Sequence, residues 1–296
     1  MTPAGNRGWI AEFLRREALP ESYREVIDRH VAPLGDELAA ACAGLGRPLS
    51  VGLCGAQGSG KSTLTGALAA LLGARGLRVA ALSLDDFYLT RAERQQLART
   101  VHPLFATRGV PGTHDVDLAR RTFAQLGRDG VTALPSFDKA VDDRRDPATW
   151  PRFDAPADIV LFEGWCVGAR PQAEAALAEP INALERDEDA KGRWRRHVNA
   201  ALAGPYRPLF DGFDRLVLLQ APSFEVVFAW RREQEQKLAR RLAERGGDAH
   251  AVMDEAQLAR FIAHYERLTR HILDEMPARA DVLFALDAAR RLTRRR

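Results

Sequence analysis

The sequence feature that most constrains the fold is the glycine-rich segment GAQGSGKS, residues 55–62. It follows the apolar run LSVGLCG and precedes KSTLTGALAALLGARG, which predicts a strand, a loop and a helix in that order. In this setting the pattern G-x-x-x-x-G-K-[ST] predicts a phosphate-binding P-loop rather than an ordinary turn between strand and helix. Gly55, Gly58 and Gly60 permit backbone conformations that other residues avoid, so that N–H groups at the positive end of the helix can surround phosphates.

The P-loop therefore predicts that the chain binds a nucleoside triphosphate. Lys61 is expected to reach the β- and γ-phosphates as a point charge, and the Ser62 hydroxyl to ligate Mg²⁺. The residues expected to contact the nucleotide, ATP, are Gly55, Ala56, Gln57, Gly58, Ser59, Gly60, Lys61, Ser62 and Thr63.

The rest of the chain alternates apolar strand candidates with amphipathic helices. Strands are expected over 78–84, 157–164, 214–222 and 280–287, and helices over 61–76, 91–99, 115–130, 223–245 and 253–276. This alternation predicts an α/β fold with a parallel sheet covered on both faces. Residues 7–44 have apolar positions at helical spacing, interrupted by Pro20 and Pro33, which predicts two or three helices before the main fold.

Two groups of carboxylates follow predicted strands. Glu163 ends the apolar run DIVLFEG, where a charge is costly unless a cation lies nearby, so we predict that it contacts the metal. Asp85 and Asp86 follow the strand RVAALSL, and in a βαβ unit this strand ends at the same edge of the sheet as the P-loop. We predict that Asp85 accepts the proton of a substrate hydroxyl and that Asp86 supports it or contacts the metal. The alternative, that the pair caps the next helix, remains open at this point.

Composition excludes several classes of function. The formal net charge is only +3, and no basic stripe with interleaved aromatic residues is present, so we expect neither nucleic acid nor a membrane as partner. Cys42, Cys54 and Cys166 lack metal-like spacing, which argues against a zinc site or a disulfide framework. The sequence contains no secretory leader pattern and no membrane span, so the cytoplasm is the expected location. The terminal RRLTRRR, residues 290–296, is interpreted as a frayed, solvated end.

Five segments in order resemble the plant-type D-glycerate 3-kinase family and its bacterial and fungal relatives. They are GLCGAQGSGKST, SLDDFYLT, RGVPGTHDV, PSFDKAVDDRRDPATWP and VLFEGW, within a resemblance that runs from about residue 50 to 286. That family is a branch of the P-loop kinases, with phosphoribulokinase, uridine kinase and pantothenate kinase. The resemblance implies a three-layer sandwich with a five-stranded parallel sheet, the P-loop strand at its centre. It also implies ATP-dependent phosphorylation of a hydroxyl on a small acceptor, with D-glycerate as the leading candidate. The corresponding domains are an N-terminal helical extension, 1–46, and a P-loop kinase domain, 47–296.

The resemblance also implies roles for individual residues. It makes Asp85 the catalytic base and Glu163 the Walker B acid, and it places a lid arginine at Arg231, with Arg232 as the fallback. The residues expected on the acceptor side are Tyr88, Arg108, His114, Asp115, Asp138, Lys139 and Arg144.

An anionic acceptor such as glycerate needs cations for its carboxylate, and Arg108, Lys139 and Arg144 are the candidates. Lys139 is one of only four lysines among 43 basic residues, which fits a specific role. A solvated charged loop is the alternative for each of the three. Phe137 stands where relatives often have tyrosine, and residues 185–215 are idiosyncratic, so the acceptor is the least constrained part.

Other kinds of function remain open from the sequence. A kinase for a nucleoside, pantothenate or a sugar phosphate would carry the same P-loop. A P-loop ATPase or GTPase switch is a further alternative, although the chain contains no N-K-x-D segment to read guanine. No prediction of oligomeric state follows.

Overall fold

The main sheet of the computed structural model, which describes residues 8–244 and 253–294, has six strands in the order β10-β9-β8-β1-β7-β2. The strands are β1 (Leu49–Gly55), β2 (Val79–Ser83), β7 (Ile159–Gly164), β8 (Arg215–Gln220), β9 (Val282–Leu286) and β10 (Leu292–Arg294). The predicted parallel sheet with the P-loop strand at its centre is confirmed, because β9, β8, β1, β7 and β2 are parallel neighbours. The sixth strand was not expected. Part of the terminal segment interpreted as frayed forms β10, antiparallel to β9.

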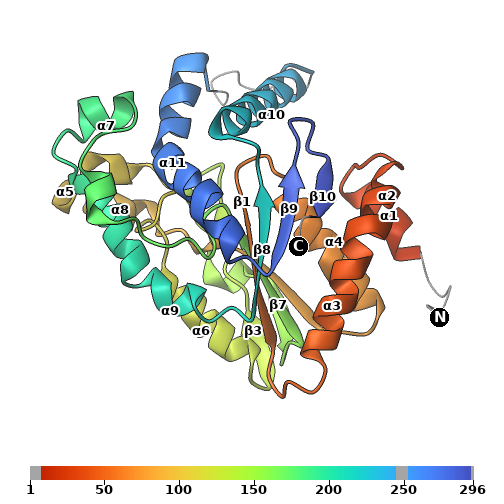
Figure 1. The fold of residues 1–296 in the computed structure, drawn as a ribbon. Helices are drawn as coiled ribbons and strands as arrows, with labels where there is room; N and C mark the ends of the chain where they lie inside the picture. Colours follow the sequence, from red (N-terminus) through yellow and green to blue (C-terminus); the bar gives the residue numbers. More distant parts are fainter. Residues whose placement is uncertain (1–7, 245–252, 295–296) are drawn as a thin grey trace.

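Helices cover both faces of this sheet, so the molecule has three layers (Figure 1). One face is covered by α1 (Gly8–Arg16), α3 (Ala32–Cys42) and α4 (Lys61–Ala74), and the other by α6 (Val116–Leu126), α8 (Arg193–Ala203), α9 (Tyr206–Phe210) and α11 (Glu255–Glu275). The remaining helices are α2 (Tyr23–Val26), α5 (Arg91–Thr100), α7 (Ala183–Glu188) and α10 (Phe224–Glu244), with a π-helical turn η1 (Ile27–Val31) between α2 and α3. Short 3₁₀ turns are η2 (Leu84–Phe87), η3 (Pro103–Ala106), η4 (Pro147–Thr149), η5 (Glu174–Leu177) and η7 (Met276–Ala278).

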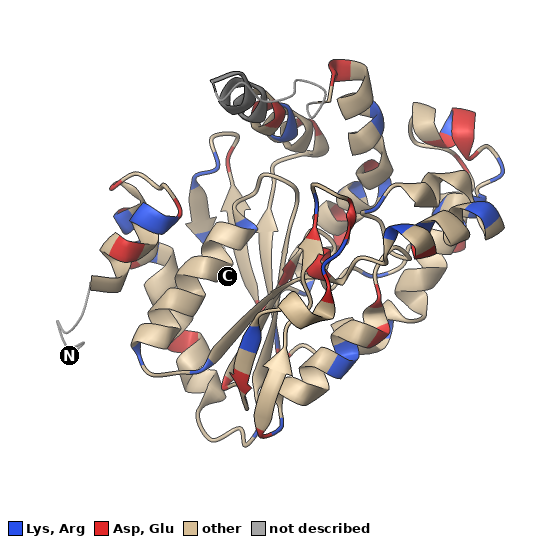
Figure 2. Ribbon diagram, turned by 180° about the vertical axis from the view of Figure 1, so that it is seen from behind, with Lys and Arg blue, Asp and Glu red and all other residues tan. Residues whose placement is uncertain are grey.

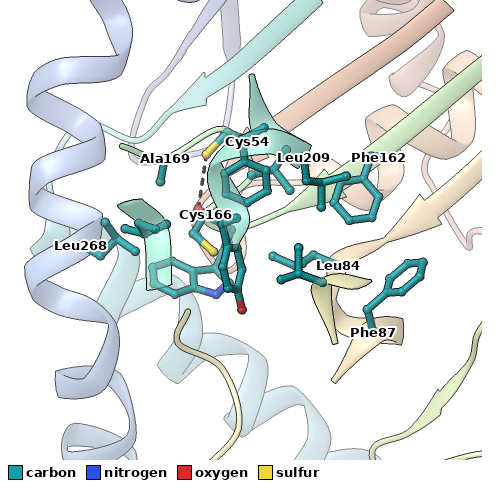
Figure 3. Close-up of a cluster of buried hydrophobic side chains, with 14 of the residues drawn as sticks. Cys54, Leu84, Phe87, Phe162, Cys166, Ala169, Leu209 and Leu268 are labelled. Atoms are coloured by element: carbon teal, nitrogen blue, oxygen red, sulfur yellow. Dashed lines mark hydrogen bonds between the residues drawn. The ribbon is translucent and has the colours of Figure 1, made fainter. Parts of the chain in front are cut away.

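Side chains that alternate along each strand pack into two large apolar clusters, one on each face of the sheet. On β1, Val51 and Leu53 pack toward α4, whereas Cys54 belongs to the opposite cluster. Figure 3 shows that opposite cluster, in which Cys54 donates a hydrogen bond to the Trp165 carbonyl at 3.3 Å. Burial raises the pKa of Cys54 to about 12, so this thiol is a packed, unreactive side chain.

The N-terminal helices share their core with the P-loop helix. Phe13, Leu34 and Leu38 are at most 2% exposed and belong to the same apolar cluster as β1 and α4. The division of the chain between residues 46 and 47 stays a prediction. Among the described residues, every helix is too short or too polar to cross a lipid bilayer.

Two small antiparallel pairs extend the fold beside the main sheet. They are β3 (Gly130–Ala133) with β6 (Arg152–Ala155), and β4 (Phe137–Asp138) with β5 (Asp143–Arg144). The β4–β5 hairpin is held against the segment after β2, because the Phe137 amide donates to Asp86 at 3.2 Å and Arg144 donates to the Tyr88 carbonyl at 2.9 Å. Figure 2 shows acidic and basic residues side by side in the loops near the upper end of the sheet.

Candidate active site

The P-loop joins β1 to α4 through two glycines in the left-handed region of backbone space. Gly58 has φ of +79° and Gly60, the N-cap of α4, has φ of +86°. A Cβ at Gly58 would also come within 2.9 Å of the Cβ of Trp230. Both positions therefore require glycine, for conformation and, at Gly58, for space as well.

A carboxylate, a lysine and a hydroxyl meet beside this loop because β1 and β7 are neighbours in register, with Leu53 opposite Glu163. Ser62 Oγ donates to Glu163 Oε1 at 2.7 Å, and Lys61 Nζ lies 4.0 Å from Oε2. Glu163 Oε2 is buried and has no hydrogen-bond partner.

This donor set fits Mg²⁺, which prefers carboxylate and hydroxyl oxygens and usually takes further ligands from water and substrate phosphates. Among the described residues, no three or more His, Cys, Asp or Glu side chains form a complete metal cage.

The neighbouring aspartates lie in different surroundings, both in the η2 turn that follows β2. Asp85 accepts hydrogen bonds from the Tyr88 hydroxyl at 2.9 Å and from Lys139 Nζ at 2.5 Å. Burial by itself would raise the pKa of Asp85. The charges of Lys139 and Lys61 outweigh burial, so the pKa of this carboxyl lies below its usual value. Asp85 is therefore ionised at neutral pH.

Asp86 is turned toward the β4–β5 hairpin, where it accepts the Phe137 amide. Burial raises the pKa of Asp86 to about 6, with a further contribution from the charge of Asp85. The capping alternative for the pair fails, because the residues whose side chains cap η2 and α5 are Ser83 and Thr90.

A cleft of about 360 Å³ opens at the carboxyl ends of β1, β2 and β7. Of the residues singled out in the sequence, it is lined by Gln57, Gly58, Lys61, Ser62, Asp85, Tyr88, Arg108, Lys139, Glu163 and Arg231. Gly55, Ala56, Ser59, Gly60 and Thr63 do not line it. The P-loop, the predicted base Asp85 and two of the three cations predicted to bind the acceptor, Arg108 and Lys139, therefore line the same cleft.

The cleft also includes residues that the sequence did not single out. They are Ser83, Trp165, Gln234, Phe261 and Tyr265. Phe261 and Tyr265 lie one helical turn apart on α11, and the Tyr265 hydroxyl donates to the Arg108 carbonyl at 3.2 Å. Their spacing indicated only a buried helix face, so no signal in the sequence assigned them to this site.

Four of the predicted acceptor-side residues, His114, Asp115, Asp138 and Arg144, do not line the cleft. His114 stacks on Tyr88 with ring centroids 4.5 Å apart, and its Nδ1 lies 2.6 Å from the Tyr206 hydroxyl. Burial lowers the pKa of His114 to about 3, so the ring is neutral. Asp115 caps α6 and lies 3.4 Å from Arg144, whose Nη2 also donates to the Tyr88 carbonyl. His114 and Arg144 thus contact Tyr88 directly, and Asp115 contacts Arg144.

The fourth, Asp138, is paired instead with Arg145 at 2.8 Å. Of the three predicted acceptor-side cations, two line the cleft. They are Lys139 and Arg108, which pairs with Asp142 and lies 5.6 Å from the Phe137 ring centroid.

Helix α10 presents Arg231, but not the adjacent Arg232, to the cleft. Arg231 lines the cleft, pairs with Glu235 and lies 5.7 Å from the Phe261 ring centroid. Arg232 is half exposed and lies 3.9 Å from Glu255, outside the cleft lining. The structure therefore separates two residues that helical periodicity left equivalent.

In sequence and in fold, the chain is similar to known kinases. A kinase of Schizosaccharomyces pombe that is described as uncharacterized, mug58, is 36% identical over 231 residues, 74% of this chain and 79% of that protein. The chloroplastic D-glycerate 3-kinase of Arabidopsis thaliana is 30% identical over 229 residues, which cover 74% of this chain but only 46% of the plant protein. The D-glycerate 3-kinase structure from Cryptococcus neoformans var. grubii matches with a TM-score of 0.71 and 27% identity, over 90% of this chain and 98% of that one.

One family model also matches part of the chain. It describes the methylmalonyl Co-A mutase-associated GTPase MeaB and covers residues 22–88. The match includes the P-loop and ends at Tyr88, so it does not reach Arg108, Lys139 or Glu163.

Proposed function

Because this chain belongs to the D-glycerate 3-kinase family of P-loop kinases, we propose that it transfers the γ-phosphate of ATP to a hydroxyl of a small anionic hydroxy acid, D-glycerate first among the candidates. The observation that carries this proposal is the surroundings of Asp85. This carboxylate shares one cleft with the P-loop lysine, and a cation of the acceptor side, Lys139, is bonded directly to it.

On the nucleotide side, the P-loop amides and Lys61 would bind the phosphates at the N-terminus of α4. Ser62 and the Glu163 oxygen that has no hydrogen bond, Oε2, would hold Mg²⁺. The chemistry that Mg²⁺ supplies when bound is neutralisation of charge on the β- and γ-phosphate oxygens. Arg231 would approach the same phosphates from the lid helix.

Asp85 would act as the general base. Its lowered pKa keeps it ionised at neutral pH, and the Tyr88 hydroxyl fixes one of its oxygens. The acceptor hydroxyl gives its proton to Asp85 as its oxygen bonds to the γ-phosphorus and the bond to the ADP oxygen breaks. Asp86 accepts the hairpin amide outside the cleft lining, so its proposed role is support of the hairpin rather than contact with the metal.

The acceptor's own charge would be matched by Lys139 and Arg108. Both now pair with carboxylates of the protein, Asp85 and Asp142. An acceptor carboxylate can replace the first of these contacts by binding Lys139, which leaves Asp85 free for the hydroxyl. A neutral acceptor offers no such exchange, and this is why an anionic hydroxy acid suits the cleft better than a nucleoside.

The test is ATP turnover by the purified protein with Mg²⁺ and a panel of acceptors. D-glycerate, L-glycerate, glycerol, pantothenate, uridine and ribulose 5-phosphate separate charge, stereochemistry and size, and Lys61→Ala is the control for the nucleotide site. We expect turnover that depends on D-glycerate and is absent with glycerol. Turnover with uridine alone would contradict the acceptor assignment, and slow hydrolysis indifferent to every acceptor would favour a P-loop ATPase.

A further inference from the structure

The turn between β9 and β10 contacts both the P-loop and the lid helix. Figure 1 shows the β9–β10 hairpin beside β8, the strand from which the chain runs into α10. Arg290 lies in this turn with φ of +63°. Its Nε donates to the Gly58 carbonyl at 3.0 Å, and its Nη2 donates to Glu233 Oε2 at 2.6 Å. One guanidinium thus bonds the P-loop and α10 at the same time.

A second set of contacts joins the same three elements. Arg290 lies over the Trp230 ring, 5.3 Å from its centroid, and Trp230 Nε1 donates to the Ala288 carbonyl at 2.8 Å. Trp230 is only 3% exposed and leaves no room for a Cβ at Gly58. We call Gly58, Trp230, Glu233, Ala288 and Arg290 the P-loop–lid junction.

The residue next to Trp230 is Arg231, which lines the cleft. Since the junction fixes Trp230 and Glu233 on either side of Arg231, it also fixes where the Arg231 side chain begins. Arg290 is suited to this role because its planar guanidinium presents several donors at fixed angles, whereas an ammonium is a single point charge.

We propose that Arg290 is a positioning residue that couples the phosphate-binding loop to the lid arginine, Arg231. It keeps the first turns of α10 against Gly58, so that Arg231 is aimed at the phosphates when the nucleotide is bound. The inference rests on the phosphoryl transfer of the proposed function, but not on which acceptor is used.

The test is a double-mutant cycle on kcat that combines Arg290→Ala with Arg231→Ala. If Arg290 acts through Arg231, each single variant lowers kcat, and the double variant is no slower than Arg231→Ala alone, within about twofold, because the two changes remove one shared contribution. Losses that multiply in the double variant would contradict the proposal, because a general structural role does not depend on Arg231.

Matched variants keep the result interpretable. Arg291 is the neighbouring arginine with an 84% exposed side chain paired to Asp287, and Arg291→Ala should leave kcat unchanged. Arg290→Lys retains the positive charge but loses the planar guanidinium with its several donors, so it should recover only part of the kcat that Arg290→Ala loses. If thermal melting shows that Arg290→Ala does not fold, Arg290→Lys takes its place in the double-mutant cycle.

The wild-type protein tests the proposed function separately. A wild type without turnover on D-glycerate contradicts that function but leaves the coupling open to measurement, because the same cycle can be run on the rate of ATP hydrolysis.

Discussion

Replacing Lys139 by methionine removes the ammonium from Asp85 while keeping a side chain of similar length. In the proposed reaction the lysine serves two partners in turn, the Asp85 carboxylate in the free protein and the acceptor carboxylate in the complex. The variant should therefore change both the affinity for the acceptor and the acidity of the base, and the two effects can be measured separately.

The effect on affinity follows from the energy of a charge-assisted hydrogen bond. Such a bond contributes about 1.5–3 kcal/mol, which corresponds to roughly 10- to 150-fold in KM for an anionic acceptor. Two features of the site favour the lower end of that range. Lys139 must give up Asp85 to bind the acceptor, and its side chain is 59% exposed, so water screens its charge. We expect KM for D-glycerate to rise about tenfold.

The effect on acidity has a definite sign. In the wild type, burial would raise the pKa of Asp85, but the charges of Lys139 and Lys61 hold it below the usual value. Without Lys139, burial is opposed by fewer favourable charges, so the pKa of Asp85 rises. The base is then protonated over a wider acidic range, and the acid limb of kcat/KM moves to higher pH.

The assay is ADP release coupled to a spectrophotometric readout, with acceptor titrations repeated from acidic to neutral pH. Lys191→Met is the matched control, because Lys191 is exposed and does not line the cleft. An unchanged KM together with an unmoved acid limb in Lys139→Met would refute the assignment of this lysine to the acceptor and to Asp85.

The remaining predictions concern the base, the lid, the core and the second aspartate. Asp85→Asn should keep the affinity for ATP, measured by titration, and lower kcat by roughly two to four orders of magnitude, and an unchanged kcat would exclude Asp85 as the base. Arg231→Ala should lower kcat at least tenfold, about 1.4 kcal/mol of transition-state stabilisation, whereas Arg232→Ala should leave it unchanged, and equal effects would contradict the side-chain geometry. Leu34→Ala should lower the free energy of unfolding by about 2–5 kcal/mol in denaturant titration, since Leu34 is fully buried against the P-loop helix, and a negligible change would show that the N-terminal helices are a separate appendage. Asp86→Asn should retain kcat and raise the melting temperature at neutral pH.

Much of the site could be predicted because its residues adjoin strands. The P-loop, Asp85 and Glu163 each follow an apolar run, and parallel strands bring their carboxyl ends to one edge whatever the rest of the fold does. Tyr265 could not be predicted in this way. The amphipathic pattern of α11 shows that one face is buried, but it does not show which part of the molecule that face contacts.

Arg290 was misjudged for a related physical reason. Its segment is a turn followed by a three-residue edge strand, too short to show any periodicity, and a run of arginines resembles a solvated tail. His114 and Arg144 show the opposite limit. A motif can place residues near a site, but whether they line the cleft or pack against Tyr88 depends on tertiary contacts that no local pattern encodes.

The adjacent aspartates show how packing can give two neighbouring carboxyl groups opposite pKa shifts. Asp85 is matched by cations and stays ionised, whereas Asp86 is buried against the hairpin with a pKa raised to about 6 from 3.8. A carboxyl with a raised pKa favours the folded state while it is protonated, and that contribution is lost as the pH rises from about 4 to about 6. At neutral pH the ionised Asp86 therefore costs stability, at most about 3 kcal/mol. Asparagine has the same shape and can still accept the Phe137 amide, so Asp86→Asn should be more stable than the wild type at neutral pH, with the advantage disappearing near pH 4. A loss of activity that excess Mg²⁺ restores would instead assign Asp86 to the metal and overturn this division of roles.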